Sequence, residues 1–214
     1  MQQPNYYEQD RKEVVDFLPV QASVILDIGC GVGAFGAGLK AQKDIEIWGV
    51  EPVSDVAASA DKVLDKVING LFDEHASLPD AYFDAVVFND SLEHFPDPFP
   101  PLELAKTKLK KDTGVIVASI PNVRFIRNIR HVLFEKDWKY TDKGILDRTH
   151  LRFFTKKSMV RTFEEAGYEV ISIEGINPHR WNTIPILFLR MFFGSLMADM
   201  RFPQYVVVAK VAKS

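Results

Sequence analysis

A glycine-rich loop between two acidic residues is the first feature of this sequence that could do chemistry. The loop follows an apolar run and holds one cysteine among closely spaced glycines: Gly29, Cys30, Gly31, Gly33 and Gly36. Glycines let a backbone pass close to a ligand, and the amides at the start of a following helix can donate hydrogen bonds to it. Asp27 lies just before the loop, and Glu51 lies 20 residues beyond Gly31. This spacing is typical of a loop that binds a nucleotide-like cofactor.

Asp27 indicates which cofactor the loop holds. In an NAD-binding turn its carboxylate would face the pyrophosphate, and two anions a few ångströms apart repel each other. A ligand with a ribose, an adenine and a cationic amino-acid tail fits better, and S-adenosylmethionine is such a ligand. Glu51 can accept hydrogen bonds from the ribose hydroxyls of either cofactor. The sequence therefore favours S-adenosylmethionine, with an NAD-linked oxidoreductase as a distant alternative.

Short apolar runs and helical patterns alternate along the chain and must position this loop. The runs expected to form strands are 24–28, 45–50, 66–69, 84–88, 115–120, 168–173 and 205–211. Helices are expected at 34–42, after Ser54, at 102–109 and at 155–166. One run, 84–88, is apolar at almost every position, as in parallel strands that are covered on both faces. This alternation predicts an α/β fold with a doubly wound sheet.

Length and composition indicate one folded domain. The chain has 214 residues, 47% of them hydrophobic and 26% charged, which is close to the globular average. We expect a single domain over residues 1–214, with a cofactor-binding core at about 20–121. Two insertions, at about 122–150 and 174–203, interrupt the alternation of strands and helices. The first insertion follows the carboxyl end of a strand, where open α/β sheets bind ligands, so it is expected to form a lid or a wall of the acceptor site.

Four motifs resemble those of one enzyme family in their order and spacing. They lie at residues 24–33 with Glu51, at 83–98 with a Leu-Glu-His triplet, at 114–122 and at 146–155. In these motifs, from residue 24 to about 170, the chain is similar to class I S-adenosylmethionine-dependent methyltransferases. The last motif is similar to that of methyltransferases from glycan and cell-surface polysaccharide pathways and, more loosely, from ubiquinone biosynthesis. The resemblance implies a Rossmann-like sheet of seven strands, mostly parallel with the last strand antiparallel, and S-adenosylmethionine as the cofactor.

The resemblance also implies a set of cofactor contacts. The residues that fall around the cofactor are Asp27, Gly29, Cys30, Gly31, Gly33, Glu51, Pro52, Leu71, Phe72, Asn89, Asp90 and Ser91. The loop glycines and Asp27 fall on the methionine part, and Glu51 falls on the ribose. The three polar residues after the fourth strand fall under the methyl-bearing sulfur. Cys30 is expected to fill a small space beside the cofactor.

The adenine contacts depart from the family pattern. The family usually has an acidic residue directly after the glycine that follows the third strand, but Gly70 is followed by Leu71 and Phe72. These two side chains and Pro52 are therefore expected to pack against the adenine. Asp73 or a backbone carbonyl would then accept from the adenine amino group.

Two histidines in the motifs are candidates for catalysis. Methyl transfer to a hydroxyl requires alignment of the acceptor and removal of its proton. His150 is the expected general base, with a backbone-bonded loop histidine as the alternative, and His94 is the second candidate. Arg148 and Arg152 flank His150, and an extended segment would bring all three to one face, where the arginines bind the acceptor or are simply solvated. No metal site is expected, and the single cysteine excludes metal sites built on several cysteines.

The net charge of −3 hides an asymmetry. Residues 124–161 hold 11 Lys and Arg against 4 Asp and Glu, a local charge of +7, so the remainder carries −10. Within this segment Arg124, Arg127 and Arg130 would form one stripe if residues 123–134 are helical. The segment is either a solvated surface or a surface for an anionic substrate, a nucleic acid or a membrane.

The expected function is methyl transfer to a small-molecule or glycan-type acceptor, with oxygen as the acceptor atom. One alternative is an RNA or protein methyltransferase that uses the basic segment, although the balanced total charge does not indicate a nucleic-acid partner. Another alternative is a cofactor-binding assembly partner without activity.

An apolar segment at residues 181–198 lies within the second insertion. Its longest apolar run, 184–198, is too short to span a bilayer and contains Arg190. A segment that is apolar on nearly every side packs within a lid, forms a homodimer interface or contacts a lipid at a membrane surface. Residues 1–13 are polar and lack the apolar core of a signal peptide, so a cytoplasmic location is expected.

Overall fold

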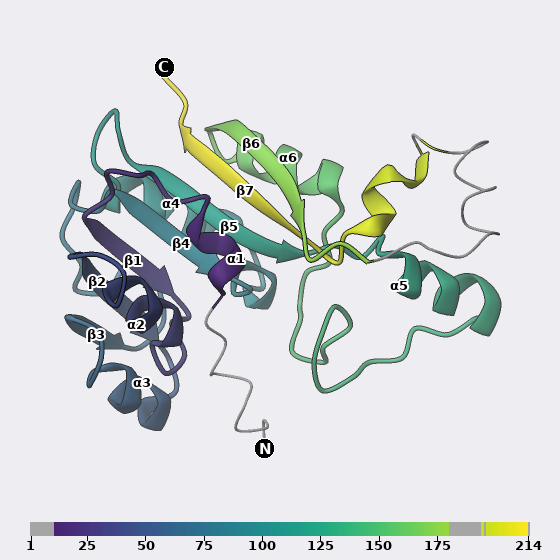
Figure 1. Cartoon of the computed structure of the whole chain (residues 1–214), viewed down its shortest axis with the longest axis horizontal. Coiled ribbons are helices and arrows are strands. Elements are labelled where there is room, and N and C mark those ends of the chain that lie inside the picture. The colour runs from purple at the N-terminus through teal and green to yellow at the C-terminus, as the bar shows by residue number, and fades with distance from the viewer. Residues whose placement is uncertain (1–10, 180–193, 195, 214) are drawn as a thin grey trace.

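Seven strands form one sheet in the order β3-β2-β1-β4-β5-β7-β6 (Figure 1). The computed structural model describes residues 11–179, 194 and 196–213. β7 is antiparallel to its neighbours β5 and β6, and the other neighbouring pairs are parallel. The strands are β1 (Val24–Ile28), β2 (Glu46–Glu51), β3 (Lys66–Asn69), β4 (Ala85–Asn89), β5 (Val115–Pro121), β6 (Tyr168–Ile176) and β7 (Gln204–Val211). The Rossmann-like sheet with an antiparallel last strand is therefore confirmed.

Helices cover both faces of the sheet. Alternate residues of a strand point to opposite faces, so Ile25 and Leu26 of β1 belong to different apolar clusters. The cluster with Ile25 receives side chains from α1 (Lys12–Val15), α2 (Ala34–Lys40) and α3 (Ser54–Ala60). The cluster with Leu26 receives them from α4 (Phe99–Lys108) and α6 (Lys156–Glu165). Burial on both faces explains why the central strands are apolar at nearly every position.

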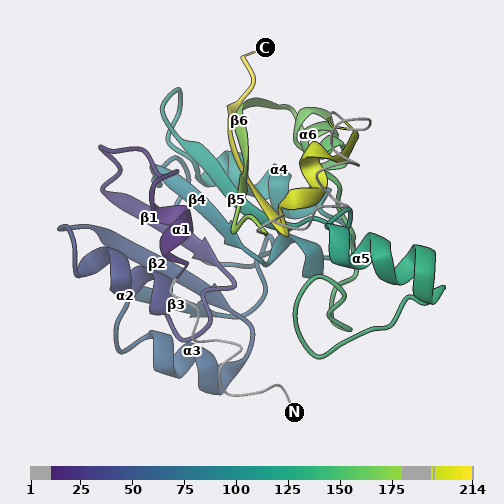
Figure 2. The same cartoon turned by 45° about the vertical axis from the view of Figure 1, so that its right-hand side comes forward.

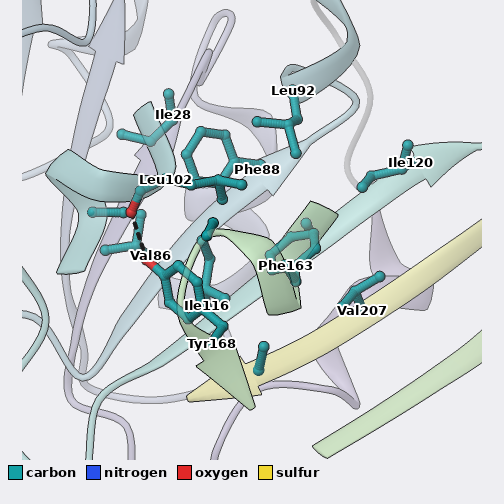
Figure 3. Packing of buried hydrophobic residues seen from close by; sticks show 14 of the residues in the cluster. Ile28, Val86, Phe88, Leu92, Leu102, Ile116, Ile120, Phe163, Tyr168 and Val207 are labelled. Carbon is teal, nitrogen blue, oxygen red and sulfur yellow. Dashed lines mark hydrogen bonds between the residues drawn. The ribbon is translucent and has the colours of Figure 1, made fainter. Parts of the chain in front are cut away.

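The cluster under α4 and α6 fixes the central strands (Figure 3). Phe88 of β4, Ile116 of β5 and Phe163 of α6 are each fully buried in it. The hydroxyl of Tyr168 at the start of β6 donates to the carbonyl oxygen of Leu102 in α4 at 2.7 Å. This hydrogen bond joins the sheet to the helix in an otherwise apolar region. The cluster thereby holds the strand ends from which the functional site is built.

Two elements differ from their expected bounds. β6 continues to Ile176, because its residues pair with β7 as far as Gln204, so the second insertion begins at residue 177 rather than 174. The helix over 123–134 that an arginine stripe would require is not formed: α5 (Ile126–Arg130) begins three residues later, and a single π-helical turn, η3 (His131–Glu135), follows it. The Asn122 side-chain oxygen accepts from the amide of Arg124 at 3.0 Å in a turn that leaves Arg124 outside the helix. Arg124, Arg127 and Arg130 therefore do not form one stripe on a helix.

The two insertions meet at Asn122, which is fully buried just after β5. Its side-chain amide donates to the carbonyl oxygens of Asp199 and Phe202, both at 2.9 Å. Asp199 belongs to the short 3-10 helix η4 (Ala198–Arg201). Figure 2 shows α5 extending away from the sheet, beside the chain that leads into β7. The first insertion therefore starts from a fixed point against the end of the second.

The apolar segment 181–198 lies largely outside the described residues, so its expected role stays a prediction. Among the residues that the structure describes, no helix is both long enough and apolar enough to cross a membrane.

Candidate functional site

A cleft of about 1210 Å³ lies where the parallel strands end. Its walls come from the last residues of β1, β2, β4 and β5 and from the segments that follow β1 to β4, together with Arg11, the start of β7 and part of the first insertion. Eleven of the twelve residues expected to hold the cofactor line this cleft: Asp27, Gly29, Cys30, Gly31, Glu51, Pro52, Leu71, Phe72, Asn89, Asp90 and Ser91. The topology thus brings the separate motifs of the sequence into one site.

The glycine loop passes tightly under the cleft. Gly29 has φ 77°, and a Cβ atom at this position would lie 3.0 Å from the Cβ of Ser91, so both the backbone angle and the space require glycine. Gly33 is the one predicted contact that does not line the cleft. It precedes α2 with φ 82°, and a Cβ there would lie 2.8 Å from a methyl group of Val63. Gly33 therefore serves the turn into α2.

Glu51 is held in place by the loop itself. One carboxylate oxygen accepts from the amide of Gly31 at 3.1 Å, and the other accepts from the amide of Val53 at 3.0 Å. The side chain is buried, and burial raises its pKa. A carboxylate oxygen has several lone-pair sites, so each oxygen can still accept from a ribose hydroxyl. The geometry fits the expected role of Glu51.

Asp27 is a buried carboxyl whose Oδ1 lacks a partner. Burial, followed by the charge of Glu51, raises the pKa of Asp27 to about 7. In the described residues, every buried side-chain polar atom without a hydrogen-bond partner belongs to Asp27, Asn89, Ser91 or Glu93. Buried polar groups are normally paired, so this concentration at the ends of β1 and β4 indicates a polar ligand. A ligand with a positive charge would also stabilise the ionised form of Asp27. These residues fit S-adenosylmethionine.

Arg11 also lines the cleft, and it was not predicted from the sequence. It forms an ion pair with Asp90, whose carboxylate also accepts from Gln204 and Ser119. Arg11 and Asp90 are 79 positions apart, so no local pattern signals the contact. The guanidinium adds the positive group that the carboxylate of an amino-acid ligand requires.

The expected adenine wall is partly apolar. Phe72 is buried and packs edge-to-face on Phe88, with ring centroids 6.1 Å apart. Leu71 is exposed and forms the rim, and Asp73 and Pro52 also line this part of the cleft. Cys30 is buried, and burial raises the pKa of its thiol. The Cys30 sulfur occupies the space where a side chain on Gly49 would lie.

The Leu-Glu-His triplet and the segment around His150 are bonded to each other. The carbonyl oxygen of Glu93 accepts from the amides of Leu151 and Arg152, at 2.9 and 3.0 Å. Nδ1 of His94 donates to the carbonyl oxygen of Thr149 at 3.1 Å. The His94 and His150 rings meet edge to face, with centroids 4.8 Å apart. These contacts bring the two candidate catalytic histidines together on one wall of the cleft.

A side-chain turn orients His150. The Asp147 carboxylate accepts from the amide and the hydroxyl of Thr149, at 2.8 and 2.7 Å, which reverses the chain just before the histidine. Nδ1 of His150 donates to the carbonyl oxygen of Ile145 at 3.1 Å. In a neutral imidazole this leaves Nε2 as an acceptor. Burial lowers the pKa of His150, and the neighbouring His94 lowers it further, so the ring is neutral at pH 7.

Glu93 completes a small polar cluster behind the histidines. Its carboxyl is fully buried, burial raises its pKa to about 8, and one oxygen lies 3.8 Å from Nε2 of His150. The nearest polar atoms of Glu93, His94 and His150 all lie within 4.8 Å of one another. Ligands of a tetrahedral zinc ion would lie roughly 3.4 Å apart. The three groups are therefore spaced more widely than the ligands of a formed zinc centre.

Arg148 and Arg152 were expected to bind the acceptor, but neither lines the cleft. The turn at Asp147 prevents the extended conformation that would bring them to one face with His150. Arg148 instead forms an ion pair with Asp142 at 2.6 Å on the surface, and Arg152 is exposed. The cation that the insertion does bring to the cleft is Lys143.

Known proteins share both the sequence pattern and the fold. A family model described as a methyltransferase domain matches residues 3–173. The ubiquinone biosynthesis O-methyltransferase of Azoarcus sp. (strain BH72) is 29% identical over 163 residues, which cover 71% of this chain and 66% of the relative. That of Aeromonas salmonicida (strain A449) is 28% identical over 159 residues, covering 72% and 66%. The chain thus spans just under two thirds of these relatives. The structure of a SAM-dependent methyltransferase from Archaeoglobus fulgidus has a TM-score of 0.67 at 23% identity, over 89% of this chain and 86% of that one.

Proposed function

The chain belongs to the S-adenosylmethionine-dependent methyltransferase family, and from this premise we propose that it methylates a hydroxyl oxygen of a small-molecule or glycan-type acceptor. The curated relatives are named O-methyltransferases, which supports oxygen as the acceptor atom.

The cofactor side of the proposed reaction rests on Asp27, Glu51 and Arg11. When bound, S-adenosylmethionine supplies a methyl group on a positively charged sulfur. Glu51 would hold the ribose, and Arg11 would face the carboxylate of the methionine part. Asp27 would complement the positive charge of the ligand. The thiol of Cys30 stays protonated and takes no part.

The position of His150 at the cleft, with its ring held by a hydrogen bond, is the observation that best supports the proposal. A hydroxyl acceptor must lose its proton, and a positioned imidazole with its pKa near the working pH does this well. His150 lines the cleft, and the bond from Nδ1 to Ile145 leaves Nε2 as the nitrogen that would accept the proton. His94 lies against the ring and is proposed to orient it.

The wall near the histidines suits a compact acceptor with an apolar face. Phe95, Pro121 and Pro203 line this part of the cleft, and Lys143 and Gln204 supply polar groups. Apolar walls with a few placed donors are typical of sites for small ligands. A sugar ring or a phenol presents both a hydroxyl and such a face.

The test follows a labelled methyl group into its product. The full chain would be incubated with tritium-labelled S-adenosylmethionine and cell extract separated into glycan and lipid-soluble fractions, and the labelled product identified by mass spectrometry. We expect the label on an oxygen. Label on nitrogen or carbon would reject oxygen as the acceptor atom, and no label in any fraction would reject the proposed activity.

His150→Ala should lower kcat with the identified acceptor about a thousand-fold, because a general base contributes roughly that much. Its affinity for S-adenosylmethionine, measured by calorimetry, should stay unchanged. His131→Ala is the matched control, since His131 is partly exposed and bonds to Glu135 instead of lining the cleft. Full turnover by His150→Ala would reject the base assignment and leave the family unaffected.

The pH profile adds a second readout for His150. A base works when it is neutral, and the pKa of His150 lies below its ordinary 6.5. The wild-type rate should therefore be constant near neutral pH and fall only below pH 6.5.

Chelation with EDTA should leave the rate unchanged, and a loss of rate would point to a metal ion in the cluster of Glu93, His94 and His150.

A further inference from the structure

The first insertion carries an exposed apolar surface at its outer end. We call residues 126–143 the arm, which comprises α5, η3 and the loop after them. Thirteen consecutive residues, 132–144, are exposed. They include five large apolar side chains within nine positions: Val132, Leu133, Phe134, Trp138 and Tyr140. Leu133 is 64% exposed and Phe134 is 79% exposed. Single exposed apolar residues are common, but such a concentration on one segment marks an interaction surface.

The arm is a fixed element. Ile126 and Ile129 on the inner side of α5 pack against Met197 and Met200. At the far end of the arm, Trp138 contacts Phe153 edge to face, with ring centroids 5.2 Å apart. The arm extends away from the sheet in both views (Figures 1 and 2). Its apolar tip is therefore presented by a supported structure.

Positive charges alternate with these apolar side chains. Arg127, Lys136, Lys139 and Lys143 are exposed, and none of them takes part in an ion pair between described residues. The tip, residues 132–140, holds two acidic residues: Glu135, which is bonded to His131 at 2.8 Å, and the exposed Asp137, so the four cations remain in excess. The arm thus combines exposed aromatic rings with unneutralised cations.

We propose that the arm docks on the surface of a lipid bilayer that contains anionic phospholipids. Trp and Tyr favour the boundary between headgroups and hydrocarbon, where Leu133 and Phe134 could enter the apolar layer. Lys136 and Lys139 would attract the anionic headgroups, and long basic side chains keep their charges in water while their stems lie on apolar surface.

A second copy of the chain fits this surface less well. The core of a protein interface is depleted of charged residues, because their desolvation is costly. Lys136 and Lys139 lie between Phe134 and Tyr140, so a dry protein contact would bury these charges. A headgroup layer, by contrast, keeps them hydrated.

The arm leads directly into the cleft. Lys143 ends the arm and lines the cleft, as do Gly144 and Ile145 after it. Docking would hold the mouth of the cleft near the membrane surface, where an acceptor attached to a lipid could reach it. The docking itself does not depend on the proposed methyl transfer.

The test is sedimentation of the full chain with vesicles. One set contains phosphatidylcholine alone, and the other contains equimolar phosphatidylcholine and phosphatidylglycerol. We expect binding to the mixed vesicles, much weaker binding to phosphatidylcholine, and a decrease with added salt. Phe134→Glu should lower the partition coefficient on mixed vesicles at least ten-fold. Replacing both Lys136 and Lys139 by Gln should lower it about twenty-five-fold, since each cation contributes about five-fold.

Val20→Glu is the matched control, because Val20 is fully exposed on another part of the surface and should bind as the wild type does. Cofactor affinity measured by calorimetry should be equal in all variants, which shows that each is folded. The proposal is overturned if the wild type stays in solution with both vesicle types, or if Phe134→Glu sediments like the wild type. It is also overturned if ultracentrifugation shows a dimer that Phe134→Glu dissociates while no vesicle binding occurs.

Discussion

The two sides of the cleft are built in different ways. On the cofactor side, the ends of buried strands hold Asp27 and Glu51, and backbone amides of the loop fix Glu51 at hydrogen-bonding distance. On the acceptor side, His150, Lys143 and Ile145 come from an insertion whose outer part is exposed over thirteen residues. The cofactor side is thus shaped by the sheet itself, and the acceptor side by a segment attached to it.

This difference indicates which part of the protein can vary its specificity for the methyl acceptor. A site made from strand ends and tight glycines cannot change without disturbing the core, because Gly29 has no room for a side chain. A site made from an insertion can change its side chains while the sheet stays the same. We therefore expect substitutions in the insertion to change the choice of acceptor, and substitutions at the strand ends to change cofactor binding.

The largest effect on ligand affinity is expected on the cofactor side, from Glu51→Ala. This change removes the acceptor for the ribose and for the amides of Gly31 and Val53, and should raise the Kd for S-adenosylmethionine about a hundred-fold, or ~3 kcal/mol. Isothermal calorimetry measures it. Glu46→Ala, at the opposite end of the same strand, should leave Kd unchanged. An equal loss in both variants would mean that the strand, and not its carboxyl end, governs cofactor affinity.

The substitution Asn122→Ala should affect the acceptor side of the cleft and leave the cofactor side nearly unchanged. The change removes two donated bonds to the second insertion and the accepted bond from Arg124, which should cost about 2 kcal/mol in urea unfolding. The KM for the acceptor should rise about ten-fold, while the Kd for the cofactor should change less than about three-fold. A comparable loss of cofactor affinity would show that the insertion also shapes the cofactor side.

The smallest effect is expected from Arg148→Ala. Arg148 forms an exposed ion pair with Asp142, and such pairs contribute roughly 0.5 kcal/mol or less. Acceptor kcat/KM should stay within about two-fold of the wild type, whereas Lys143→Ala, in the cleft, should lower it more. Steady-state kinetics of both variants measure this difference in acceptor kcat/KM. A larger loss for Arg148 would restore the sequence-based assignment of that residue to the acceptor.

The sequence predicted most of the residues that line the cofactor side of the cleft, because their signals are local. Asp27, the glycines and Glu51 each lie at the end of an apolar run, and the ends of parallel strands meet at one edge of the sheet. Arg11 was missed because its contact with Asp90 joins distant parts of the chain. No spacing rule connects those two residues.

The acceptor side was predicted only in part. His94 and His150 were found through their motifs, but Arg148 and Arg152 were assigned on the assumption of an extended segment. The signal for a turn was present, since an Asp followed two residues later by Thr favours a side-chain turn. The extent of α5 depended on Asn122, whose partners in the second insertion are almost eighty residues away.

The bonds at the two ends of the first insertion have an evolutionary consequence. Asn122 fixes where the segment leaves the sheet, and the carbonyl oxygen of Glu93 fixes where it returns, at Leu151. Between these anchors the chain forms a closed loop, and the entropy cost of closing a loop grows only slowly with its length. Residues can therefore be gained, lost or exchanged in the arm at little cost to folding. A change in the length or the side chains of the insertion would therefore leave both anchors and the cofactor side of the cleft in place.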